Sequence, residues 1–538
     1  MGRSPASVYR EQMTSAAASW WAALTGVVAA AVVLATSELL SLWVGSGGSA
    51  LIAVGSAIID LAPAWVKDLT IALFGTGDKI ALFVILGVVL LVLSALAGVL
   101  EHRRPPLGVV LLGIGALIGL IAVLTRAGAT GFHGVPVVVG AVVGVVVLRT
   151  GIDRLRRWEL AERPRAEASA SVGTVVGPQV ERRGFLTMTF VAGALAVVAG
   201  VGARYVSSMT TAVTELRAAI KLPRASVVAD AVPIGADLDV AGLTSYVTPN
   251  ADFYRIDTAL QVPSVDVDSW RLKIVGMVEN EIEIDFAQLL AKPLVEHMAI
   301  LACVSNDVGG NLIGNALWLG YPIRELLAEA RPRAGADMVL STSIDGFTAG
   351  TPLDVLEDEG TQALLAVGMN GQPLPLEHGF PVRMVVPGLY GYVSATKWVV
   401  ELEVTRFADA EGYWIPRGWD AKGPVKLASR IDTPAWGGTP VTAGERVPIA
   451  GVAWDPHVGV AGVEVRIDGG AWKPARLADS VSADTWRQWV YDDWTPDRGV
   501  HELSVRAMSV DGSTQSEDYL PPAPNGSEGW HSITVTAT

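Results

Sequence analysis

The chain has 538 residues, of which 51% are hydrophobic and 17% charged, a net charge of −14 and one cysteine, Cys303. A chain of this length needs several domains with separate cores. One cysteine excludes an internal disulfide framework and any CxxC zinc or redox pair, and the net negative charge argues against a nucleic-acid partner. The high apolar content predicts membrane segments joined to a globular part.

The first 150 residues predict four transmembrane helices, because their apolar runs approach the roughly 20 residues that cross a bilayer. The runs are residues 20–44, 80–100, 107–124 and 134–148. The fourth run is short, and it spans only if residues 127–133 add the first turns. Residues 49–78 contain Asp60, Pro63, Lys67 and Asp68, so we expect this segment to be non-spanning or re-entrant.

Positively charged loops give the expected orientation, since loops rich in Lys and Arg stay cytoplasmic. The N-terminus, "EHRRPP" at 101–106 and the basic stretch 149–165 fall on one side only if residues 49–78 do not cross. Residues 151–184 are then a cytoplasmic basic linker, and a fifth helix over 185–206 leads out of the cell. The expected location is the cell membrane, with a multi-pass anchor in lipid and the C-terminal half outside the cytoplasm.

The fifth predicted helix begins at "ERRGFLTMTF", residues 181–190. Arg182 and Arg183 are explained equally well by two readings. They anchor the cytoplasmic end of a span, or they form a twin-arginine export signal. The export pathway carries folded proteins, so it would suit a C-terminal half that acquires a cofactor before export.

After a polar linker, residues 207–244, the pattern becomes that of a globular protein. Within residues 245–424, segments 269–278 and 397–404 read as strands, and segments 284–292 and 321–330 read as short helices, which predicts an α+β domain. From residue 425 to 538 only short strands follow, separated by Gly, Pro and Asp turns. Such regular short strands predict a β-sandwich.

Cys303 ends the strand-like "MAILA" and opens the loop "VSNDVGG". Most free cysteines are small buried hydrophobes, but the loop glycines would let the backbone approach a ligand closely. A thiolate there suits a soft metal such as molybdenum, zinc or copper. A lone cysteine without nearby His or carboxylate spacing cannot complete a zinc site, so a cofactor would have to supply the other ligands.

Four motifs in order carry a resemblance to the sulfite oxidase family of molybdopterin-dependent oxidoreductases over roughly residues 245–538. They are "TPNADFYRIDTALQVPSVDVDSWRLKIVG", "LACVSNDVGGNLIGNALWLGYPIRELL", "ALLAVGMNGQPLPLEHGFPVRMVVPGLYGYVSATKW" and "SRIDTPAWGGTPVTAGERVPIAGVAW". Together with the apolar runs of the first half, the resemblance implies a multi-domain fold: an N-terminal α-helical transmembrane region, then an α+β sulfite-oxidase-like molybdopterin domain over 245–424, then an immunoglobulin-like β-sandwich over 425–538.

The resemblance also implies a molybdenum held by one pterin dithiolene, oxo ligands and a single protein thiolate, which would be Cys303. Arg255, Arg383 and Lys397 could pair a phosphate, the arginines through bidentate hydrogen bonds and the lysine as a point charge. The full set of positions that match cofactor contacts of the family is Asn250, Phe253, Tyr254, Arg255, Asp345, His378, Arg383, Ala395, Thr396 and Lys397.

The sequence departs from the family on the substrate side. Sulfite oxidases carry arginines four and five residues after the ligand cysteine, where this chain has Asp307 and Val308. A carboxylate beside the pocket would repel sulfite, although Asp307 could instead face away and cap the loop through backbone amides. The substrate-side tyrosine corresponds to Tyr413, with Arg417 and Trp419 as alternatives.

We therefore expect a membrane-anchored, extracytoplasmic molybdenum oxidoreductase that performs two-electron oxygen-atom transfer on a small-molecule substrate other than sulfite. A reductase of oxidised small molecules or of protein methionine sulfoxide is a variant of this reading. The sequence has no CxxCH haem motif, so a separate electron carrier is expected. The alternative from another class is a catalytically inactive binding ectodomain of a membrane transporter or receptor.

Overall fold

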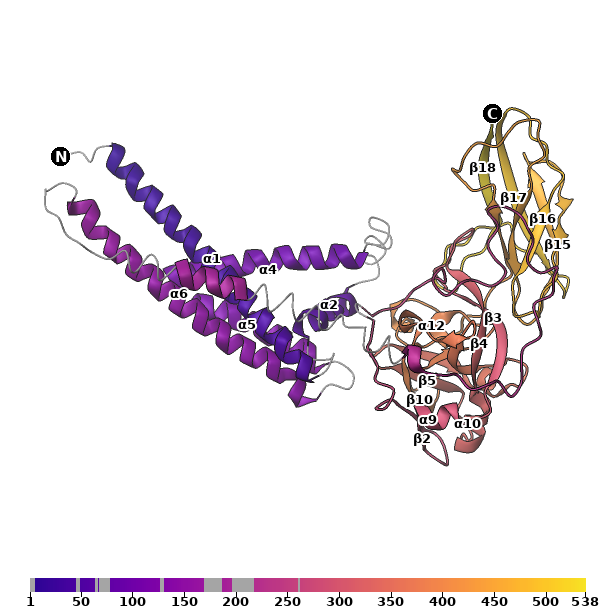
Figure 1. The fold of residues 1–538 in the computed structure, drawn as a ribbon, viewed down its shortest axis with the longest axis horizontal. Coiled ribbons are helices and arrows are strands. Elements are labelled where there is room, and N and C mark those ends of the chain that lie inside the picture. Colours follow the sequence, from indigo (N-terminus) through magenta and orange to yellow (C-terminus); the bar gives the residue numbers. More distant parts are fainter. Residues whose placement is uncertain are drawn as a thin grey trace. The chain divides into compact units, whose positions relative to one another are not determined.

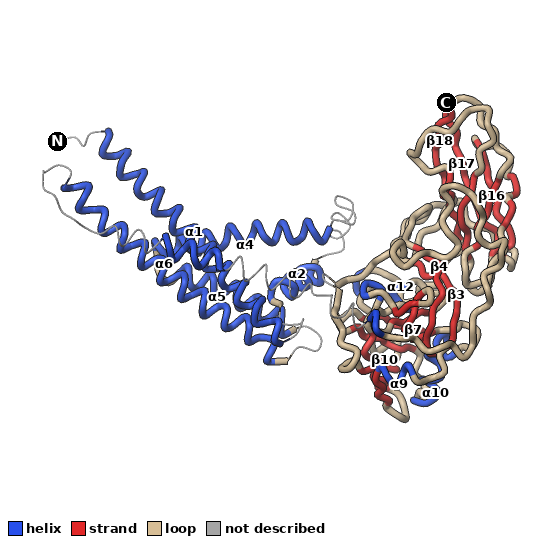
Figure 2. Tube along the Cα trace, in the orientation of Figure 1, coloured by secondary structure: helices blue, strands red, loops and turns tan. Residues whose placement is uncertain are grey.

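The computed structural model describes residues 5–44, 49–62, 66, 78–125, 130–168, 186–195, 217–259 and 262–538. They belong to two compact units. The first contains the N-terminal helices, and the second contains residues 213–258 and 262–538. Figures 1 and 2 show that the described N-terminal elements are helical, whereas the second unit is built mainly of strands and loops.

The described part of the N-terminal unit contains four long helices, the short helix α2 (Ala50–Leu61) and a further short helix over Leu186–Leu195. The long helices are α1 (Pro5–Val44), α4 (Asp78–Arg103), α5 (Leu107–Leu124) and α6 (Val135–Ala168), the last preceded by the 3-10 turn η3 (Gly131–Gly134). The segments Ala16–Ser41, Ala81–Arg103, Leu107–Leu124 and Gly131–Leu160 are long and apolar enough to cross a membrane. They coincide with the four spans predicted in the first 150 residues.

The predicted fifth span is described only over Leu186–Leu195, a shorter apolar helix. The rest of residues 185–206 lies outside the described residues, as do Arg182, Arg183 and the first ten residues of the 207–244 linker. Within the described part of residues 49–78, the main element is α2, which has 12 residues. That length is short of the roughly 20 residues a spanning helix needs.

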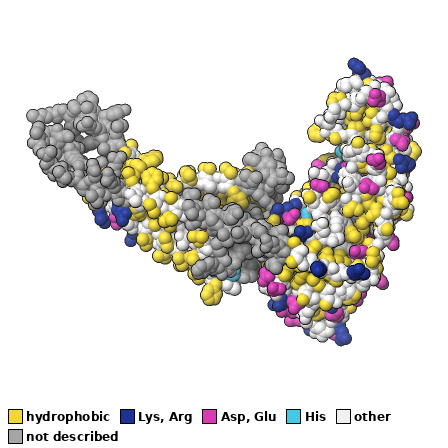
Figure 3. Space-filling view, viewed as in Figure 1, with side chains coloured by type: hydrophobic (Ala, Val, Ile, Leu, Met, Phe, Trp, Pro, Cys, Tyr) yellow, Lys and Arg dark blue, Asp and Glu magenta, His cyan; other side chains and the backbone are white. Residues whose placement is uncertain are grey.

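Close helix packing in this unit depends on small residues. A Cβ atom at Gly26 of α1 would lie 2.0 Å from the carbonyl oxygen of Ser94, and one at Gly98 of α4 would lie 1.9 Å from that of Ala22. Neither glycine can therefore be replaced without separating α1 from α4. Such small-residue contacts are typical of helices packed in membranes. Apolar side chains cover much of the described helix surface in the view of Figure 3, as a lipid-facing surface requires.

The predicted basic linker of residues 151–184 begins within a helix. Helix α6 continues to Ala168, and Leu148, Ile152 and Leu155 are buried in one apolar cluster with Ala22 of α1. Their spacing of four and three residues places them on one helix face. The arginines between these residues concealed the apolar stripe in the sequence.

In the second unit, residues 271–405 form two five-stranded sheets. The first has the order β2-β1-β10-β5-β6, and the second has the order β3-β4-β7-β8 with β9 also paired to β7. The strands of the first are β1 (Arg271–Gly276), β2 (Ile282–Asp285), β5 (Met338–Ser343), β6 (Thr348–Pro352) and β10 (Val399–Thr405). Those of the second are β3 (Val295–Ala302), β4 (Ile313–Pro322), β7 (Leu364–Met369), β8 (Gln372–Pro373) and β9 (Arg383–Val385).

Short helices connect these strands. They are α9 (Phe286–Leu290), α10 (Ile323–Ala330), α11 (Leu353–Glu357), η4 (Leu376–His378), α12 (Gly391–Ser394) and η5 (Ile415–Arg417). The strands predicted over 269–278 and 397–404 are confirmed as β1 and β10, which pair in parallel. The helices predicted over 284–292 and 321–330 are confirmed as α9 and α10. Asp285 caps α9 by accepting a hydrogen bond from the Gln288 amide, a common N-terminal signal.

The C-terminal residues form two four-stranded sheets, called here the C-terminal sheets. Their strands are β11 (Ala428–Thr433), β12 (Ile449–Trp454), β16 (Arg487–Tyr491) and β15 (Arg476–Leu477) in one, and β14 (Lys473–Pro474), β13 (Val460–Ile467), β17 (Gly499–Ser509) and β18 (His531–Ala537) in the other. Trp489 of the first sheet and Val465, Val505 and Ile533 of the second share one buried cluster. The short strands predicted for this region are therefore confirmed.

The C-terminal sheets pack against β3, the strand that leads to Cys303. Asp484 lies 2.8 Å from Nε2 of His297 on β3 and 2.9 Å from Nδ1 of His457. The Trp486 indole donates a hydrogen bond to the backbone carbonyl oxygen of Tyr246. The side-chain hydroxyl of Tyr246 donates in turn to the Thr485 hydroxyl. The contact between His297 and Asp484 thus links β3 to the chain just before β16.

Candidate active site

The loop that carries Cys303 joins β3 to β4. The Cys303 amide donates to the Leu312 carbonyl over 2.9 Å, and the Asn306 amide donates to the Cys303 carbonyl over 3.0 Å. The Asn306 side chain then accepts from the Leu312 amide over 2.8 Å. Gly309 has a φ of +76° and packs so closely on His531 that a Cβ atom would lie 2.2 Å from the imidazole ring. The loop is thus held by its own hydrogen bonds and by the C-terminal sheets.

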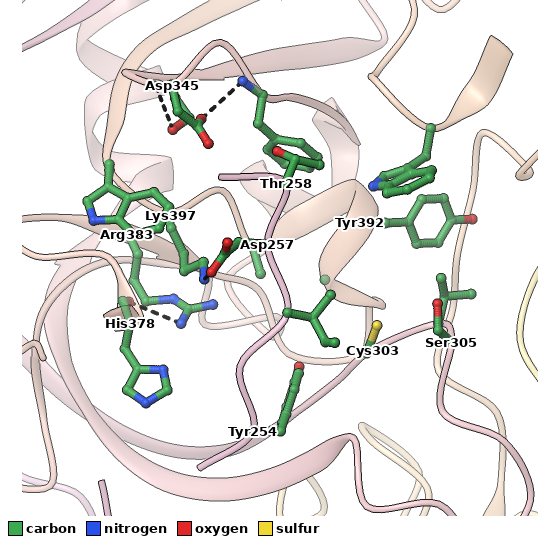
Figure 4. Close-up of a pocket in the computed structure, with 18 of the residues that line it drawn as sticks. Tyr254, Asp257, Thr258, Cys303, Ser305, Asp345, His378, Arg383, Tyr392 and Lys397 are labelled. Atoms are coloured by element: carbon green, nitrogen blue, oxygen red, sulfur yellow. Dashed lines mark hydrogen bonds and ion pairs between the residues drawn. The ribbon is translucent and has the colours of Figure 1, made fainter. Parts of the chain in front are cut away.

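Cys303 lines a cavity of about 140 Å³, far more than the roughly 10–15 Å³ that holds one water molecule. The structure brings eight of the predicted site residues to this cavity: Phe253, Tyr254, Cys303, Asp345, His378, Arg383, Ala395 and Lys397. The predicted residues that do not line it are Asn250, Arg255, Asp307, Thr396 and Tyr413. Figure 4 shows the arrangement of most of the lining side chains.

Arg383 is a buried cation whose hydrogen bonds go to carbonyl groups. Its Nε donates to Met384 over 3.3 Å and one terminal nitrogen donates to His378 over 3.2 Å. Within the described part of the chain, no carboxylate forms an ion pair with it. Burial lowers the pKa of Arg383 to about 10, so the group is still charged at neutral pH. A buried charge without a counter-ion is costly, which indicates an anionic ligand.

Lys397 is the second buried cation. Its Nζ lies 2.8 Å from Asp257, which also lies 2.9 Å from Nε of Arg255. Burial lowers the pKa of Lys397 to about 8, and the interaction with Asp257 opposes this shift. Asp257 was not among the predicted site residues, although it follows Arg255 by two positions in the first motif. The sequence analysis looked for cations that bind a phosphate, so it overlooked Asp257, the carboxylate that orients Arg255 and Lys397.

His378 is neutral at physiological pH. Burial, together with the positive charges of Arg383 and Lys397, lowers the pKa of His378 to about 4. Its ring packs edge to face on Phe253, with ring centroids 5.5 Å apart, and its Nε2 lies 3.2 Å from the Asn250 carbonyl oxygen. The neutral ring donates from Nε2 to this carbonyl oxygen, so its Nδ1 can accept a hydrogen bond without adding a third positive charge.

The segment from Thr248 to Thr258 enters the site along β4 and β7. The Thr248 amide donates to Asn315, and the Asn250 side chain donates to the Met369 carbonyl oxygen and accepts from Asn370. Asn250 thus positions this segment instead of lining the cavity. Thr396 is equally indirect, because it is fully buried and its hydroxyl lies 2.7 Å from that of Ser341.

Burial raises the pKa of the Cys303 thiol, and hydrogen bonds with Ser305 oppose the shift only in part. The thiol therefore does not ionise readily at neutral pH unless a cation or metal stabilises the thiolate. Among the described residues, no group of three or more His, Cys, Asp or Glu side chains could hold a metal ion. A metal at Cys303 needs most of its ligands from a cofactor. The thiol and the buried cations together fit a soft metal carried by an anionic organic group.

Asp307 lies on the same loop as Cys303. The structure has Asp307 exposed on the loop, and it is not among the residues that line the Cys303 cavity. Its carboxylate accepts hydrogen bonds from the Val308 amide over 2.8 Å and from the Tyr519 hydroxyl over 3.2 Å. This position matches the alternative of a loop cap. The reason is the turn at Asn306, which directs the next side chain toward the C-terminal sheets.

Tyr413 also lies outside the cavity, packed between Phe347 and Trp414 with ring centroids 5.9 and 5.1 Å away. Of its two alternatives, Arg417 does not line the cavity either, whereas Trp419 does. The 3-10 turn η5 and the positive φ of Gly418, +95°, reverse the chain. This reversal brings Trp419 back beside Trp414, to whose carbonyl the Trp419 amide donates.

Trp414, Trp419 and Tyr392 together form one face of the cavity, called here the aromatic wall. The ring centroids of Tyr392 and Trp419 are 5.8 Å apart, and those of Trp414 and Trp419 are 6.4 Å apart. The Tyr392 hydroxyl donates to the Asp420 carbonyl oxygen over 2.7 Å. Sequence reasoning found Trp419 only as an alternative and missed the other two.

Comparison with known proteins gives a consistent family. The model of the oxidoreductase molybdopterin binding domain matches residues 259–414. Mitochondrial sulfite oxidase of Rattus norvegicus is 31% identical over 342 residues, which cover 54% of this chain and 62% of that protein. The catalytic subunit MsrP of the protein-methionine-sulfoxide reductase of Burkholderia mallei is 29% identical over 215 residues, covering 35% of this chain and 61% of that protein.

The uncharacterized oxidoreductase YuiH of Bacillus subtilis is 32% identical over 158 residues, which cover 29% of this chain and 76% of that protein. This chain therefore spans most of YuiH but less than two thirds of the sulfite oxidase. The family model and these relatives agree with the thiol and the buried cations of the cavity. The chain belongs to the sulfite oxidase family of molybdopterin-dependent oxidoreductases, and its cofactor is molybdenum-molybdopterin.

Proposed function

We propose that the protein is a membrane-anchored oxidoreductase that transfers an oxygen atom, with two electrons, to or from a small molecule other than sulfite. The observation that carries this proposal is the pairing of Cys303 with Arg383 in one cavity. The thiol is the only one in the chain, and the guanidinium has no carboxylate partner among the described residues. In a binding module without a cofactor, the buried guanidinium would have no anionic partner and the thiol would have no ligand role.

The roles of the residues follow from their positions. Cys303 supplies the single protein thiolate, and Arg383 and Lys397 bind the phosphate of the molybdopterin. Phe253, Tyr254 and Ala395 pack on the pterin, while His378 and Asp345 offer it hydrogen bonds. When bound, the cofactor supplies two-electron oxygen-atom transfer. The chain orients it, excludes water and pairs its negative charge.

Three predicted residues act indirectly in this proposal. Asn250 positions the segment that carries Phe253 and Tyr254. Arg255 shares Asp257 with Lys397 and so fixes the direction of the lysine. Thr396 holds the backbone beside Lys397 through its contact with Ser341.

The membrane part of the proposal rests on the four apolar helices. Together with a fifth span over 185–206, they anchor the chain in the cell membrane, with residues 151–184 in the cytoplasm and residues 246–538 outside. The C-terminal sheets form an immunoglobulin-like domain over 425–538 that supports the Cys303 loop. Electrons are exchanged with a separate carrier, because the sequence has no CxxCH haem motif.

Two relatives carry names with different substrates, sulfite for one and protein methionine sulfoxide for the other. Sulfite is disfavoured here because Arg383 and Lys397, two cations that line the cavity, are assigned to the cofactor phosphate. The alternative function, an inactive binding ectodomain of a transporter or receptor, would leave Arg383 as an uncompensated buried charge.

The test uses the full chain, purified in detergent from cells supplied with molybdate. Turnover is measured with reduced viologen and a panel of organic and inorganic oxides, and with ferricyanide and the corresponding reduced compounds. Cys303→Ser should retain the fold and the pterin but lose turnover, since an alkoxide is a poorer donor to this metal than a thiolate. Substantial turnover by a folded, pterin-loaded serine variant would contradict the assignment. Wild-type protein with neither molybdenum nor pterin would support the binding ectodomain.

A further inference from the structure

Arg217 lies in the predicted 207–244 linker, outside residues 259–414, which match the family model. Its side chain binds the backbone of the second unit. Its Nε donates to the carbonyl oxygens of Leu374 over 2.7 Å and Pro373 over 3.1 Å, and one terminal nitrogen donates to Pro373 over 2.7 Å. The planar fork of an arginine suits two consecutive acceptors in a way that the single ammonium of a lysine does not.

The chain that follows Arg217 packs on the same part of the second unit. Ile220 packs against the buried cluster that contains Leu374. Leu222 lies on β7, since a Cβ atom at Gly368 would be 2.8 Å from Cδ1 of Leu222. This part of the predicted linker is therefore packed as part of the second unit, with Arg217 at the end of β8.

The two carbonyl groups that Arg217 binds lie just before η4 (Leu376–His378), the turn that carries His378 to the cavity. The same turn contacts the second buried cation, because Lys397 donates from Nζ to the Glu377 carbonyl oxygen over 3.1 Å. The position of η4 thus sets the position of two side chains that line the cavity.

Gly379 ends η4 with a φ of +107° and packs against both buried cations. A Cβ atom there would lie 2.9 Å from Cβ of Arg383 and 3.1 Å from Cβ of Lys397. Arg383 also donates to the His378 carbonyl oxygen over 3.2 Å. Figure 4 shows these three side chains on one side of the cavity. Because the interior is closely packed, a shift of η4 would move all three.

We infer that Arg217 is a positioning residue of the cofactor site, because it holds the chain just before η4 and so fixes the side chains that contact the cofactor. This inference rests on the proposed function, which assigns Arg383 and Lys397 to the phosphate and His378 to the pterin. Without Arg217, the carbonyl group of the fully buried Leu374 would lose this donor. A buried carbonyl needs a partner, so the backbone before η4 would move.

The rate at which the molybdenum-loaded full chain in detergent releases its pterin tests this inference. Release is measured below the unfolding transition, by the fluorescence of pterin that passes a filter. Arg217→Met should release pterin about tenfold faster than the wild type, the lower end of the effect of removing a group one shell outside a metal site. Arg217→Lys should release it at an intermediate rate, because an ammonium can still donate to a carbonyl but without the fork.

The matched control is Arg487→Met. Arg487 binds backbone in the same way, donating to the Ala478 carbonyl oxygen over 3.0 and 2.6 Å and to that of Val460 over 2.9 Å. It lies in the C-terminal sheets and is not among the residues that line the cavity, so its loss should lower stability without faster release. Equally fast release from both methionine variants, or a folded Arg217→Met protein with the wild-type rate, would overturn the inference.

The wild type provides a second test that does not depend on the folding of a variant. Because coupling between two sites is reciprocal, bound cofactor should strengthen the contacts of Arg217. The Ile220 amide, which donates to the Arg217 carbonyl oxygen over 3.2 Å, should therefore exchange with deuterium more slowly in the loaded than in the cofactor-free chain. Equal exchange in the two forms would overturn the inference alone. A wild type with neither molybdenum nor pterin would contradict the proposed function on which it rests, so the two failures are distinguishable.

Discussion

Replacing Asp484 with Asn should destabilise the second unit mainly by loosening β3 from the C-terminal sheets. The Asp484 side chain is only 9% exposed, and it lies 2.8 Å from His297 and 2.9 Å from His457. Breaking a buried, hydrogen-bonded charge pair costs about 3–5 kcal/mol. Because Asn keeps the shape and one acceptor, we expect a loss near the lower end, about 3 kcal/mol in the free energy of unfolding.

The effect should depend on pH in a defined direction. Although burial opposes it, the hydrogen bonds from His297 and His457 hold the pKa of Asp484 well below its usual range. The contribution of Asp484 is thus present above its unfolded pKa of about 3.9 and is lost as the pH falls toward its folded pKa. The hydrogen bond with Asp484 raises the pKa of His457, against burial and helped by the nearby Asp358.

The contribution of His457 is complete below its unfolded pKa of about 6.5 and is lost as the pH rises through its folded pKa. The difference between wild type and Asp484→Asn should therefore be largest between about pH 4 and 6.5, and it should shrink toward pH 8. Urea unfolding of the full chain in detergent, followed by tryptophan fluorescence, measures it.

The matched control is Asp468→Asn. Asp468 lies 2.7 Å from His501 in the same C-terminal sheets, but its side chain is 48% exposed. Exposed ion pairs contribute about 0–1 kcal/mol, so this variant should lose far less stability than Asp484→Asn. Equal losses in the two variants, or a loss in Asp484→Asn that does not vary with pH, would refute the reasoning from burial.

Three further predictions concern the cavity and the membrane anchor. Arg383→Met should raise the thermal stability of the cofactor-free protein, since removing an unpaired buried charge can gain about 1–4 kcal/mol. The pterin content of the variant, measured by fluorescence after extraction, should fall sharply. A less stable apoprotein that keeps its pterin would contradict this. Because Asp307 lies outside the cavity, the double variant Asp307→Arg, Val308→Arg should not improve sulfite affinity in equilibrium binding, and a clear gain would return both positions to the substrate site. In a Cys303→Ser background, a cysteine that replaces Glu162 should not react with an impermeant maleimide in intact cells, whereas a cysteine that replaces Ser513 should react. Labelling of position 162 from outside would mean that the number of spans is wrong by one.

Elements set by local pattern could be predicted from the sequence. Helix α9 carries its own cap in Asp285, and β3 and β10 are continuous apolar or alternating runs. The apolar stripe of Leu148, Ile152 and Leu155 could not be predicted from the sequence, because arginines interrupt it. The burial of such a face depends on α1, which lies more than a hundred residues earlier in the chain.

Within the site, His378, Arg383 and Lys397, which belong to continuous motifs, line the cavity. Asp307 and Tyr413, which were chosen by their distance along the chain from a motif residue, do not line it. Asp307 turns away because Asn306 closes the loop on Leu312 and Tyr519, over two hundred residues later, holds the carboxylate. Trp419 lines the cavity and Tyr413 does not, because the chain reverses at Gly418, between these two residues. Counting residues along the sequence does not predict this reversal.

The central claim is that Cys303 is the only protein ligand of a molybdenum carried by one pterin. X-ray absorption at the molybdenum edge, measured on the wild type and on Cys303→Ser at equal pterin content, tests it most directly. The account predicts about one molybdenum per chain and the loss of one sulfur from its coordination in the serine variant. The same number of sulfur ligands in both proteins, or no molybdenum in the wild type, would contradict it.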